Sequence, residues 1–278
     1  MVPVAPKNYT YDGLSFTLRD AGQGQAVLFL AGWGYGSLMG EVACAGLRAE
    51  GLRVITVDLP GTGSMAEASS FVALPRLARA LAGILRDELQ LHQVLVVGHS
   101  FGSMLAQEMA LSEDDLVGSL VLVSVMSGVG GMVPDLQTAM GMLNRLLAGD
   151  ANMLHHLLEP PFLAHLRRVL GGSFTELDKP IASGTLSGQV WAASRWTNFG
   201  RISQIYQPTL ILQGDHDAVA SPEKAHAIAA LLPHAQLKIL DECGFLPFIE
   251  CPERTTAALL KFIAQQSADA AAEPAPAQ

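Results

Sequence analysis

The chain has 278 residues and half of them are apolar, so it can bury one large core and is not a disordered protein. Its 26 acidic side chains outnumber its 17 lysines and arginines, and the formal net charge of −9 argues against binding to nucleic acid or to anionic membranes, which requires basic patches. No apolar run approaches the roughly 20 residues of a membrane span. The first ten residues lack the basic start and apolar centre of a signal peptide, so we expect a soluble cytoplasmic protein without a membrane span.

The first half of the chain alternates predicted strands and helices. Asp12-Gly13 lies between two β-like segments and predicts a hairpin at the edge of a sheet. Short apolar runs bounded by glycine predict buried strands, and leucine and alanine at helical spacing predict helices. The strands expected after the hairpin are 26–30, 53–57, 94–97 and 119–124, and the helices are 37–50 and 71–90. Such alternation is typical of crossover units in a parallel sheet.

A different pattern occupies residues 127–200, where no strong β run occurs. Leucine and methionine at helical spacing predict a small helical cap in this region. Methionine is unbranched and adaptable, so Met126 and Met132 can line a pocket for an apolar ligand. The alternative is that these methionines only pack the cap onto the body of the protein.

The strand pattern resumes in the last third of the chain. Strands are expected at 208–213 and 236–240, and helices at 222–231 and 252–266. The core therefore comprises residues 1–126 and 201–266. Residues 267–278 carry no bulky apolar side chain, and we expect them to form a disordered tail.

The stretch from Val94 to Leu105, VLVVGHSFGSML, joins a buried strand to a helix through the turn Gly98 to Gly102. Two glycines allow the chain to reverse sharply, so that Ser100 takes a strained conformation at the top of the sheet. Its hydroxyl then lies beside the positive end of a helix. The alternative is an ordinary serine in a glycine-rich turn.

A glycine-rich loop, residues 31–36 (AGWGYG), follows the strand at 26–30. Alternating glycines leave main-chain N–H groups able to point at a ligand. The spacing does not match the dinucleotide-binding fingerprint, so we expect no nucleotide cofactor.

The three cysteines, Cys44, Cys243 and Cys251, are an odd number without metal-ligand spacing. We expect them to be free thiols in a reducing compartment, and we expect no metal site.

Several motifs arrive in an order that resembles the α/β-hydrolase family. They are AGWGYG at 31–36, DLPGTG at 58–63, GHSFG at 98–102, GDHD at 214–217 and GFLPFIECPE at 244–253, within a resemblance that covers Val27 to Ile263. The chain looks most like the small-ester acylhydrolases, such as pimeloyl-carrier-protein methyl ester esterases. Around Trp196 to Asp217 it is also similar to polyhydroxyalkanoate depolymerases. The resemblance implies an α/β fold with a mostly parallel, doubly wound, eight-stranded sheet and a helical cap insertion.

The resemblance also implies roles for individual residues. Ser100 corresponds to the nucleophile and Asp217 to the acid, and the N–H groups of Trp33 and Phe101 correspond to the oxyanion hole. Such N–H groups suit the charge that develops on a tetrahedral intermediate. Asp215 is more simply a solvated or capping carboxylate. The substrate-binding positions are Gly32, Met126, Met132 and Trp196, and the cap is expected to roof an apolar cavity over Ser100.

The sequence departs from the family at the catalytic base, because Phe245 stands where members carry histidine. Ala31 and Thr62 also replace histidines that relatives often carry. Phenylalanine cannot accept a proton, so activity through Ser100 should be lost or strongly impaired. The candidates for a substitute base are His99, His216 and the histidines of the cap, His155, His156 and His165, whereas His92, His226 and His234 are expected at the surface.

Three functions remain open from sequence. The first is a hydrolase of an ester, thioester or lactone with an apolar acyl part, acting as a monomer or homodimer. The second is a ligand-binding protein that uses the same pocket without catalysis, and the third is a lyase or cyclase that forms no acyl-enzyme.

Overall fold

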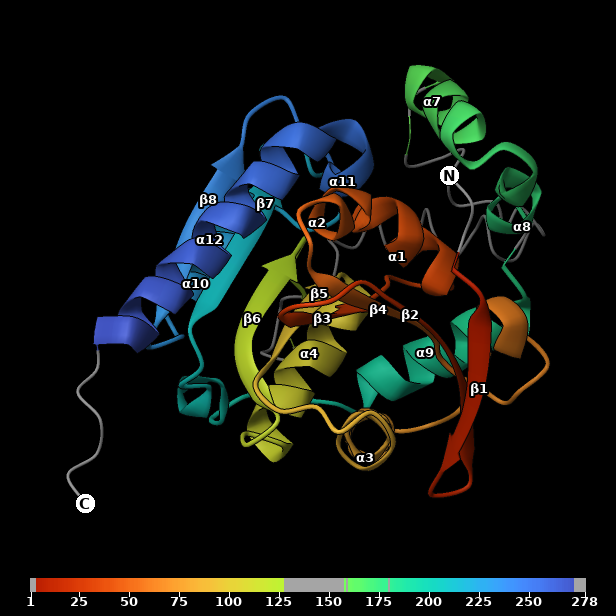
Figure 1. Cartoon of the computed structure of the whole chain (residues 1–278), viewed down its shortest axis with the longest axis horizontal. Coiled ribbons are helices and arrows are strands. Elements are labelled where there is room, and N and C mark those ends of the chain that lie inside the picture. The colour runs from red at the N-terminus through yellow and green to blue at the C-terminus, as the bar shows by residue number, and fades with distance from the viewer. Residues whose placement is uncertain (1–3, 128–157, 159, 180, 273–278) are drawn as a thin grey trace.

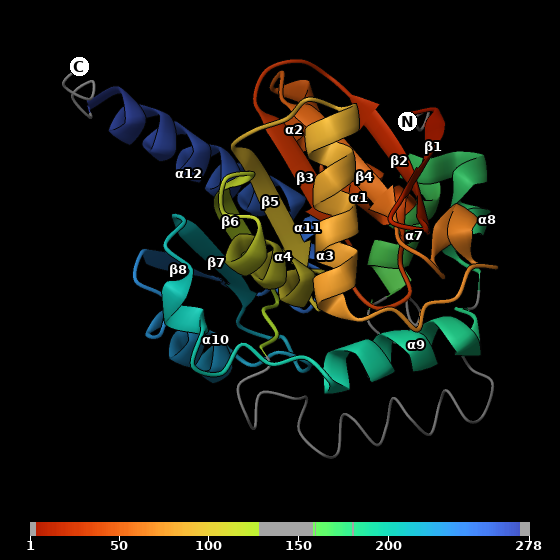
Figure 2. The ribbon, with the colours of Figure 1, turned by 90° about the horizontal axis from the view of Figure 1, so that it is seen from below.

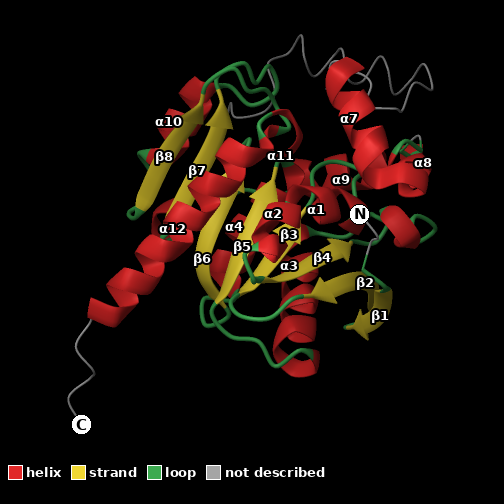
Figure 3. Ribbon diagram, turned by 45° about the horizontal axis from the view of Figure 1, so that its top comes forward, coloured by secondary structure: helices red, strands yellow, loops and turns green. Residues whose placement is uncertain are grey.

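The computed structural model describes residues 4–127, 158, 160–179 and 181–272. An eight-stranded sheet lies at the centre, with its strands in the order β1-β2-β4-β3-β5-β6-β7-β8 (Figures 1 and 3). The pairs β1–β2 and β2–β4 are antiparallel and all other pairs are parallel. The strands are β1 (Pro6–Tyr11), β2 (Leu14–Ala21), β3 (Ala26–Leu30), β4 (Arg53–Asp58), β5 (Val94–His99), β6 (Val117–Val123), β7 (Thr209–Gly214) and β8 (Ala235–Leu240). The predicted fold class is confirmed.

The hairpin at the sheet edge forms where the sequence predicts it. Asp12 and Gly13 have φ angles of 48° and 70°, so both central residues of the turn lie in the left-handed region. A turn of this kind matches the twist of two antiparallel strands, which β1 and β2 form.

Both faces of the central strands are buried. In β5, Val94 and Val96 belong to one apolar cluster, whereas Leu95 and Val97 belong to another. Successive side chains of a strand point to opposite faces, so the two clusters lie on opposite sides of the sheet. This double burial explains why these strands read as continuous apolar runs in the sequence.

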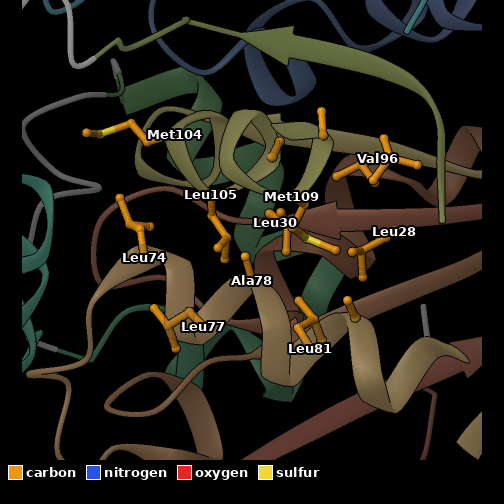
Figure 4. Close-up of a cluster of buried hydrophobic side chains, with 14 of the residues drawn as sticks. Leu28, Leu30, Leu74, Leu77, Ala78, Leu81, Val96, Met104, Leu105 and Met109 are labelled. Carbon is orange, nitrogen blue, oxygen red and sulfur yellow. The ribbon is translucent and has the colours of Figure 1, made fainter. Parts of the chain in front are cut away.

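Helices cover the two faces, as Figure 2 shows from below. Residues of α3, α4 and α10 share one cluster, and leucines of α3 pack there against Leu105 and Met109 of α4 and against Leu28 and Leu30 of β3 (Figure 4). Residues of α1, α2, α11 and α12 share the other cluster. The bounds are α1 (Ser37–Ala43), α2 (Ala45–Ala49), α3 (Leu74–Gly83), α4 (Phe101–Ser112), α10 (Pro222–Ala229), α11 (Pro247–Glu250) and α12 (Pro252–Ala272).

Short turns complete this part of the chain. They are the 3₁₀ turns η1 (Gly63–Met65) and η4 (Ile202–Gln204) and the π-helical turn η2 (Ile84–Glu88), which continues α3.

The described part of residues 127–200 consists of helices and turns and contains no strand. Its elements are α7 (Pro160–Leu170), η3 (Gly171–Ser173), α8 (Phe174–Leu177) and α9 (Ser183–Ser194). Helix α9 is bound to the body of the protein: the Thr185 hydroxyl donates to the carbonyl oxygen of Gly61, and the Ser70 hydroxyl donates to that of Gly184. Residues 128–157 lie outside the described residues. Met132 and the helical spacing predicted for this part of the cap fall within that range.

The structure corrects the expectation of three free thiols. Cys243 and Cys251 form a disulfide bond, with a Cα–Cα distance of 6.3 Å, and Cys44 is the free cysteine. Cys243 follows β8 and Cys251 precedes α12, and both are buried beside Leu240. The sequence-based argument for a reducing compartment therefore loses its basis, because disulfides are rare in such compartments.

The structure also corrects the start of the expected disordered tail. Helix α12 continues through residues 267–272. This segment is rich in alanine, which has the highest helix propensity and needs no bulky side chain to form a helix. Of the predicted tail, residues 273–278 lie outside the described part.

Candidate active site

Ser100 lies at a sharp turn between β5 and α4. Its backbone angles, φ 53° and ψ −114°, are unfavourable for a residue with a side chain, and the residue is fully buried. The flanking glycines explain how the turn forms: a Cβ at Gly98 would lie 2.4 Å from the carbonyl oxygen of Gly102, and one at Gly102 would lie 2.1 Å from that of Leu30. The turn therefore depends on close packing of strand and helix, as the sequence pattern predicts.

The hydroxyl of Ser100 contacts a thioether. It donates to Sδ of Met126 at 3.5 Å, and Met126 is itself held by α4. The Met126 N–H donates to Oγ of Ser103 at 2.9 Å, and Nε2 of Gln107 donates to the Met126 carbonyl oxygen at 2.7 Å. A thioether is a weak acceptor and cannot take the serine proton, so this contact does not activate the hydroxyl.

The two N–H groups predicted for an oxyanion hole lie on segments that meet near Ser100. The Trp33 and Phe101 rings are in contact, with centroids 5.0 Å apart. Within the described residues, neither main-chain N–H donates to a protein acceptor. A Cβ placed on Gly32 would lie 3.3 Å from Cβ of Ser100, so the loop after β3 passes directly beside the serine.

Asp217 is buried, with 4% of its surface exposed, in the loop after β7. Its Oδ1 accepts the N–H groups of Val219 and Ala220, both at 2.8 Å, and its Oδ2 accepts Nε2 of Gln213 at 2.8 Å. Burial raises the pKa of Asp217, and the hydrogen bonds from these groups oppose the rise. Three donors therefore hold the carboxylate in place, and none of the three is a histidine.

Asp215 has a different environment. It is exposed, and its Oδ1 accepts the Cys243 N–H at 3.1 Å. That hydrogen bond is the main cause of the lowered pKa of Asp215. Asp215 is therefore a solvated carboxylate that binds the main chain of the loop after β8.

Phe245 lies on the loop between β8 and α11 and is 6% exposed. Its carbonyl oxygen accepts two side-chain donors, Nε2 of His99 at 2.8 Å and Oγ of Ser124 at 2.9 Å. Its ring packs against the His99 ring, with centroids 4.7 Å apart. Ser124 follows directly after β6, so its hydrogen bond ties the loop of residue 245 to the end of a central strand.

The His99 side chain is hydrogen-bonded to the main chain and is poorly suited to act as a base. Its Nε2 faces the Phe245 carbonyl oxygen, which can only accept, so this nitrogen carries the proton. Burial lowers the pKa of His99 to about 4.

The other described histidines are exposed, and His216 lies 3.9 Å from Asp215. They are His92, His165, His216, His226 and His234. Two cap candidates, His155 and His156, lie outside the described residues.

Trp196, predicted to bind substrate, is tied to α4. Its indole N–H donates to Oε2 of Glu108 at 2.7 Å, and Arg201 donates to the same oxygen at 3.1 Å. Asn198, two residues further on, donates to Oε1 of Gln107 at 2.7 Å. This network joins the segment after α9 to the helix that follows Ser100.

Sequence reasoning missed several polar residues around the candidate site. Gln213 follows the apolar run 210–212 within β7, and Glu250 follows the apolar residues of the segment GFLPFIECPE. A polar residue in such a buried context usually has a specific hydrogen-bond partner, and this signal could have identified both. Gln189 and Ser124 offered no comparable signal.

No group of three or more His, Cys, Asp or Glu side chains is arranged to hold a metal ion in the described part of the chain. None of the helices described is both long and apolar enough to cross a membrane.

Comparison with known proteins relates this chain to a family. Residues 27–259 match the model of the alpha/beta hydrolase family. The poly(3-hydroxyalkanoate) depolymerase of Ectopseudomonas oleovorans is 31% identical over 236 residues, which cover 81% of this chain and 80% of the relative. The 2-hydroxymuconate semialdehyde hydrolase of Pseudomonas putida is 28% identical over 268 residues, covering 92% and 93%.

Solved structures show the same fold. A thermophilic esterase from Thermogutta terrifontis superposes with a TM-score of 0.77 at 22% identity, covering 95% of this chain and 99% of that one.

Proposed function

Because the chain belongs to the α/β-hydrolase family, we propose that it is a serine hydrolase for an ester, thioester or lactone with an apolar acyl part, with Ser100 as the nucleophile. The named relatives are hydrolases, and the depolymerase among them supports an ester substrate. In this proposal Phe245 leaves the enzyme without its base, so that the hydrolytic activity of this chain is strongly impaired or absent.

The observation that carries the proposal is the backbone of Ser100. A serine at φ 53° costs free energy of order 1 to 3 kcal/mol, and such strain persists where it serves a site. The hydroxyl lies at the start of α4, where the helix dipole favours negative charge. Attack of Ser100 on a carbonyl carbon would place the developing oxyanion near the N–H groups of Trp33 and Phe101, which have no protein acceptor in the described part.

The acyl part is proposed to be apolar because of what surrounds Ser100. Met126 contacts its hydroxyl, and the rings of Trp33 and Phe101, which belong to the two segments that meet near Ser100, pack against each other. Residues 127–200 are proposed to act as a cap that covers this site, with Met132, Trp196 and Gly32 as further substrate-binding positions. A monomer or homodimer suffices for the proposal, because every residue it uses comes from one chain.

The missing base determines the rate. In a serine triad, loss of one member lowers turnover by up to about a million-fold, and a residual acceleration of roughly 10³ to 10⁴ over water comes from the oxyanion hole and binding. Asp217 alone does not replace the imidazole, because its carboxylate bonds to Val219, Ala220 and Gln213, whereas the Ser100 hydroxyl contacts Met126.

A ligand-binding protein that uses the same pocket is the second candidate, and the environment of Asp217 favours it. Three donors hold the buried carboxylate without any contribution from the side chain of residue 245, so its burial does not depend on an imidazole there. A lyase or cyclase step without an acyl-enzyme shares this feature.

The decisive experiment restores the base with Phe245→His. We expect hydrolysis of a medium-chain nitrophenyl ester to rise by on the order of 10²-fold or more, with a pH profile governed by an apparent pKa near about 6.5. The gain must vanish in Phe245→His combined with Ser100→Ala. A fluorophosphonate should label Ser100 slowly in the parent chain and rapidly in the Phe245→His variant.

Phe199→His is the matched control. Phe199 is 73% exposed, so this variant adds an imidazole at the surface without supplying a base to Ser100. Equal gains in the two variants would attribute the hydrolysis to surface imidazole and defeat the proposal. No gain in a folded Phe245→His protein, together with thermal stabilisation of the parent by unhydrolysed acyl thioesters, esters or lactones, would establish the ligand-binding function instead.

A further inference from the structure

The loop that carries Phe245 is held by the carboxylate of Glu250. Oε2 accepts the Gly244 N–H at 2.8 Å and Oε1 accepts the Leu246 N–H at 2.7 Å. The two oxygens of one side chain therefore bind the main chain on both sides of residue 245. Hydrogen bonds of this kind, with an ionised acceptor, are shorter and stronger than neutral ones.

The packing between Glu250 and residue 244 is close. A Cβ on Gly244 would lie 2.5 Å from Oε2 and 3.0 Å from Oε1 of Glu250. A side chain at residue 244 would displace the carboxylate, so glycine at this position is what allows Glu250 to reach both N–H groups.

The carbonyl group of residue 245 is held by side chains of the protein core. The Phe245 carbonyl oxygen accepts His99 and Ser124, as described above. Four hydrogen bonds from three side chains thus surround residue 245, and none of them uses the Phe245 side chain. The conformation of the main chain at residue 245 is therefore set by its neighbours.

The disulfide closes this loop without setting its local conformation. Cys243 and Cys251 are eight residues apart and fix the two ends. Glu250 acts inside the closed loop, on the peptide groups next to residue 245, where the main-chain angles decide the direction of its side chain.

We propose that Glu250 is a positioning residue, whose carboxylate orients the side chain of residue 245 toward Ser100 and Asp217 by fixing the Gly244 and Leu246 N–H groups. This inference rests on the proposed function, in which residue 245 is the position of the base. It explains how the loop keeps a fixed conformation although the residue it carries cannot act as a base.

The test compares three proteins labelled with ¹⁵N-histidine. One carries Phe245→His alone, the second combines it with Glu250→Gln, and the third combines it with Glu253→Gln. Glu253 is exposed on the first turn of α12, so its replacement removes one charge near the loop without touching it. With Glu250 intact, we expect the imidazole at position 245 to be a single tautomer with a downfield Nδ1 proton bonded to Asp217. With Glu250→Gln, we expect mixed tautomers, loss of that proton signal and a pKa closer to the ordinary histidine value.

Kinetics provide the second readout. Glu250→Gln should lower kcat for nitrophenyl ester hydrolysis at least tenfold with little change in KM, because the substrate pocket is untouched. Glu253→Gln should change neither constant. Glu250→Asp keeps the charge but shortens the side chain, and we expect it to restore part of kcat.

The outcomes separate this inference from the proposed function. A Glu250-dependent imidazole signal without turnover supports the positioning role and defeats the hydrolase proposal. Turnover that is equal in the Glu250→Gln and Glu253→Gln proteins supports the hydrolase and overturns the positioning role. If Glu250→Gln does not fold, amide hydrogen exchange at residues 244 and 246 in Glu250→Asp decides, since exchange as slow as in the parent would overturn the role.

Discussion

Oε1 of Gln189 accepts the main-chain N–H of Gly34 at 2.7 Å, so helix α9 binds the loop that follows β3. This loop carries Trp33, one of the two candidate oxyanion donors. The segment proposed as a cap and the loop beside Ser100 are therefore connected through one buried glutamine.

Replacing this glutamine with leucine should destabilise the protein. Gln189→Leu leaves the Gly34 N–H without its acceptor, and we expect the free energy of unfolding to fall by about 1 to 3 kcal/mol. Urea denaturation provides the measurement, and Gln204→Leu, at an exposed glutamine of η4, is the control. Equal stability of the two variants would show that α9 does not hold the loop.

The buried histidine makes stability depend on pH. Burial lowers the pKa of His99 to about 4, against 6.5 for an ordinary histidine. Between these values the unfolded chain binds a proton that the folded chain does not, so acidification favours unfolding. The contribution of His99 to the free energy of unfolding is complete above pH 6.5, and about 3 kcal/mol of it is lost as the pH falls to 4.

Comparison with His99→Gln isolates this contribution. Glutamine can still donate to the Phe245 carbonyl oxygen but does not titrate, so the difference in stability between parent and variant should shrink as the pH falls from 6.5 to 4. Carboxylates titrate in both proteins, so their contributions cancel in the difference between the two free energies of unfolding. His92→Gln, at an exposed histidine, should follow the parent at every pH.

The Cys243–Cys251 bond should stabilise the folded chain. Closing a loop of this length, with a sequence separation of 8, reduces the entropy of the unfolded state by an amount worth about 2.5 kcal/mol. We expect dithiothreitol to lower the melting temperature of the parent and to leave Cys243→Ala/Cys251→Ala unchanged. Alkylation of the denatured, unreduced parent should modify Cys44 alone, and modification of all three cysteines would show that the bond is absent.

The turn at Ser100 should tolerate no side chain at Gly102. A Cβ there would lie 2.1 Å from the main-chain oxygen of Leu30, which cannot move without disturbing β3. Gly102→Val should therefore lower the free energy of unfolding by at least about 1 to 3 kcal/mol. In Gly184→Ala, an added Cβ meets nothing within 4 Å on α9, and stability should stay equal or rise. A Gly102→Val protein that melts with the parent would contradict the close packing.

Most elements of the fold could be predicted, because each strand is marked by a pattern of neighbouring residues in the sequence. Runs such as 26–30 and 94–97 are apolar throughout, and strands buried on both faces have this composition. The turn at Ser100 was equally local, since the glycines and the serine lie within five residues. Helix 37–50 was predicted as one element, whereas the structure divides it into α1 and α2 at Cys44.

The partners of the site could not be predicted, because they depend on distant parts of the chain. Gln189 is 155 residues from Gly34, and His99 is 146 residues from Phe245. The bond between Cys243 and Cys251 escaped prediction for another reason: spacing alone cannot tell two thiols from a disulfide. Composition misled in residues 267–272, where small side chains suggested disorder but alanine favours a helix.

The backbone of Ser100 gives this protein a trade-off between stability and activity at one residue. Glycine would adopt φ 53° without a steric penalty, so Ser100→Gly removes strain while it removes the hydroxyl. Laboratory selection for thermal stability alone would therefore favour Ser100→Gly early. The selected protein would be more stable but would lack its nucleophile. Any effort to stabilise the chain needs a functional screen beside the thermal one.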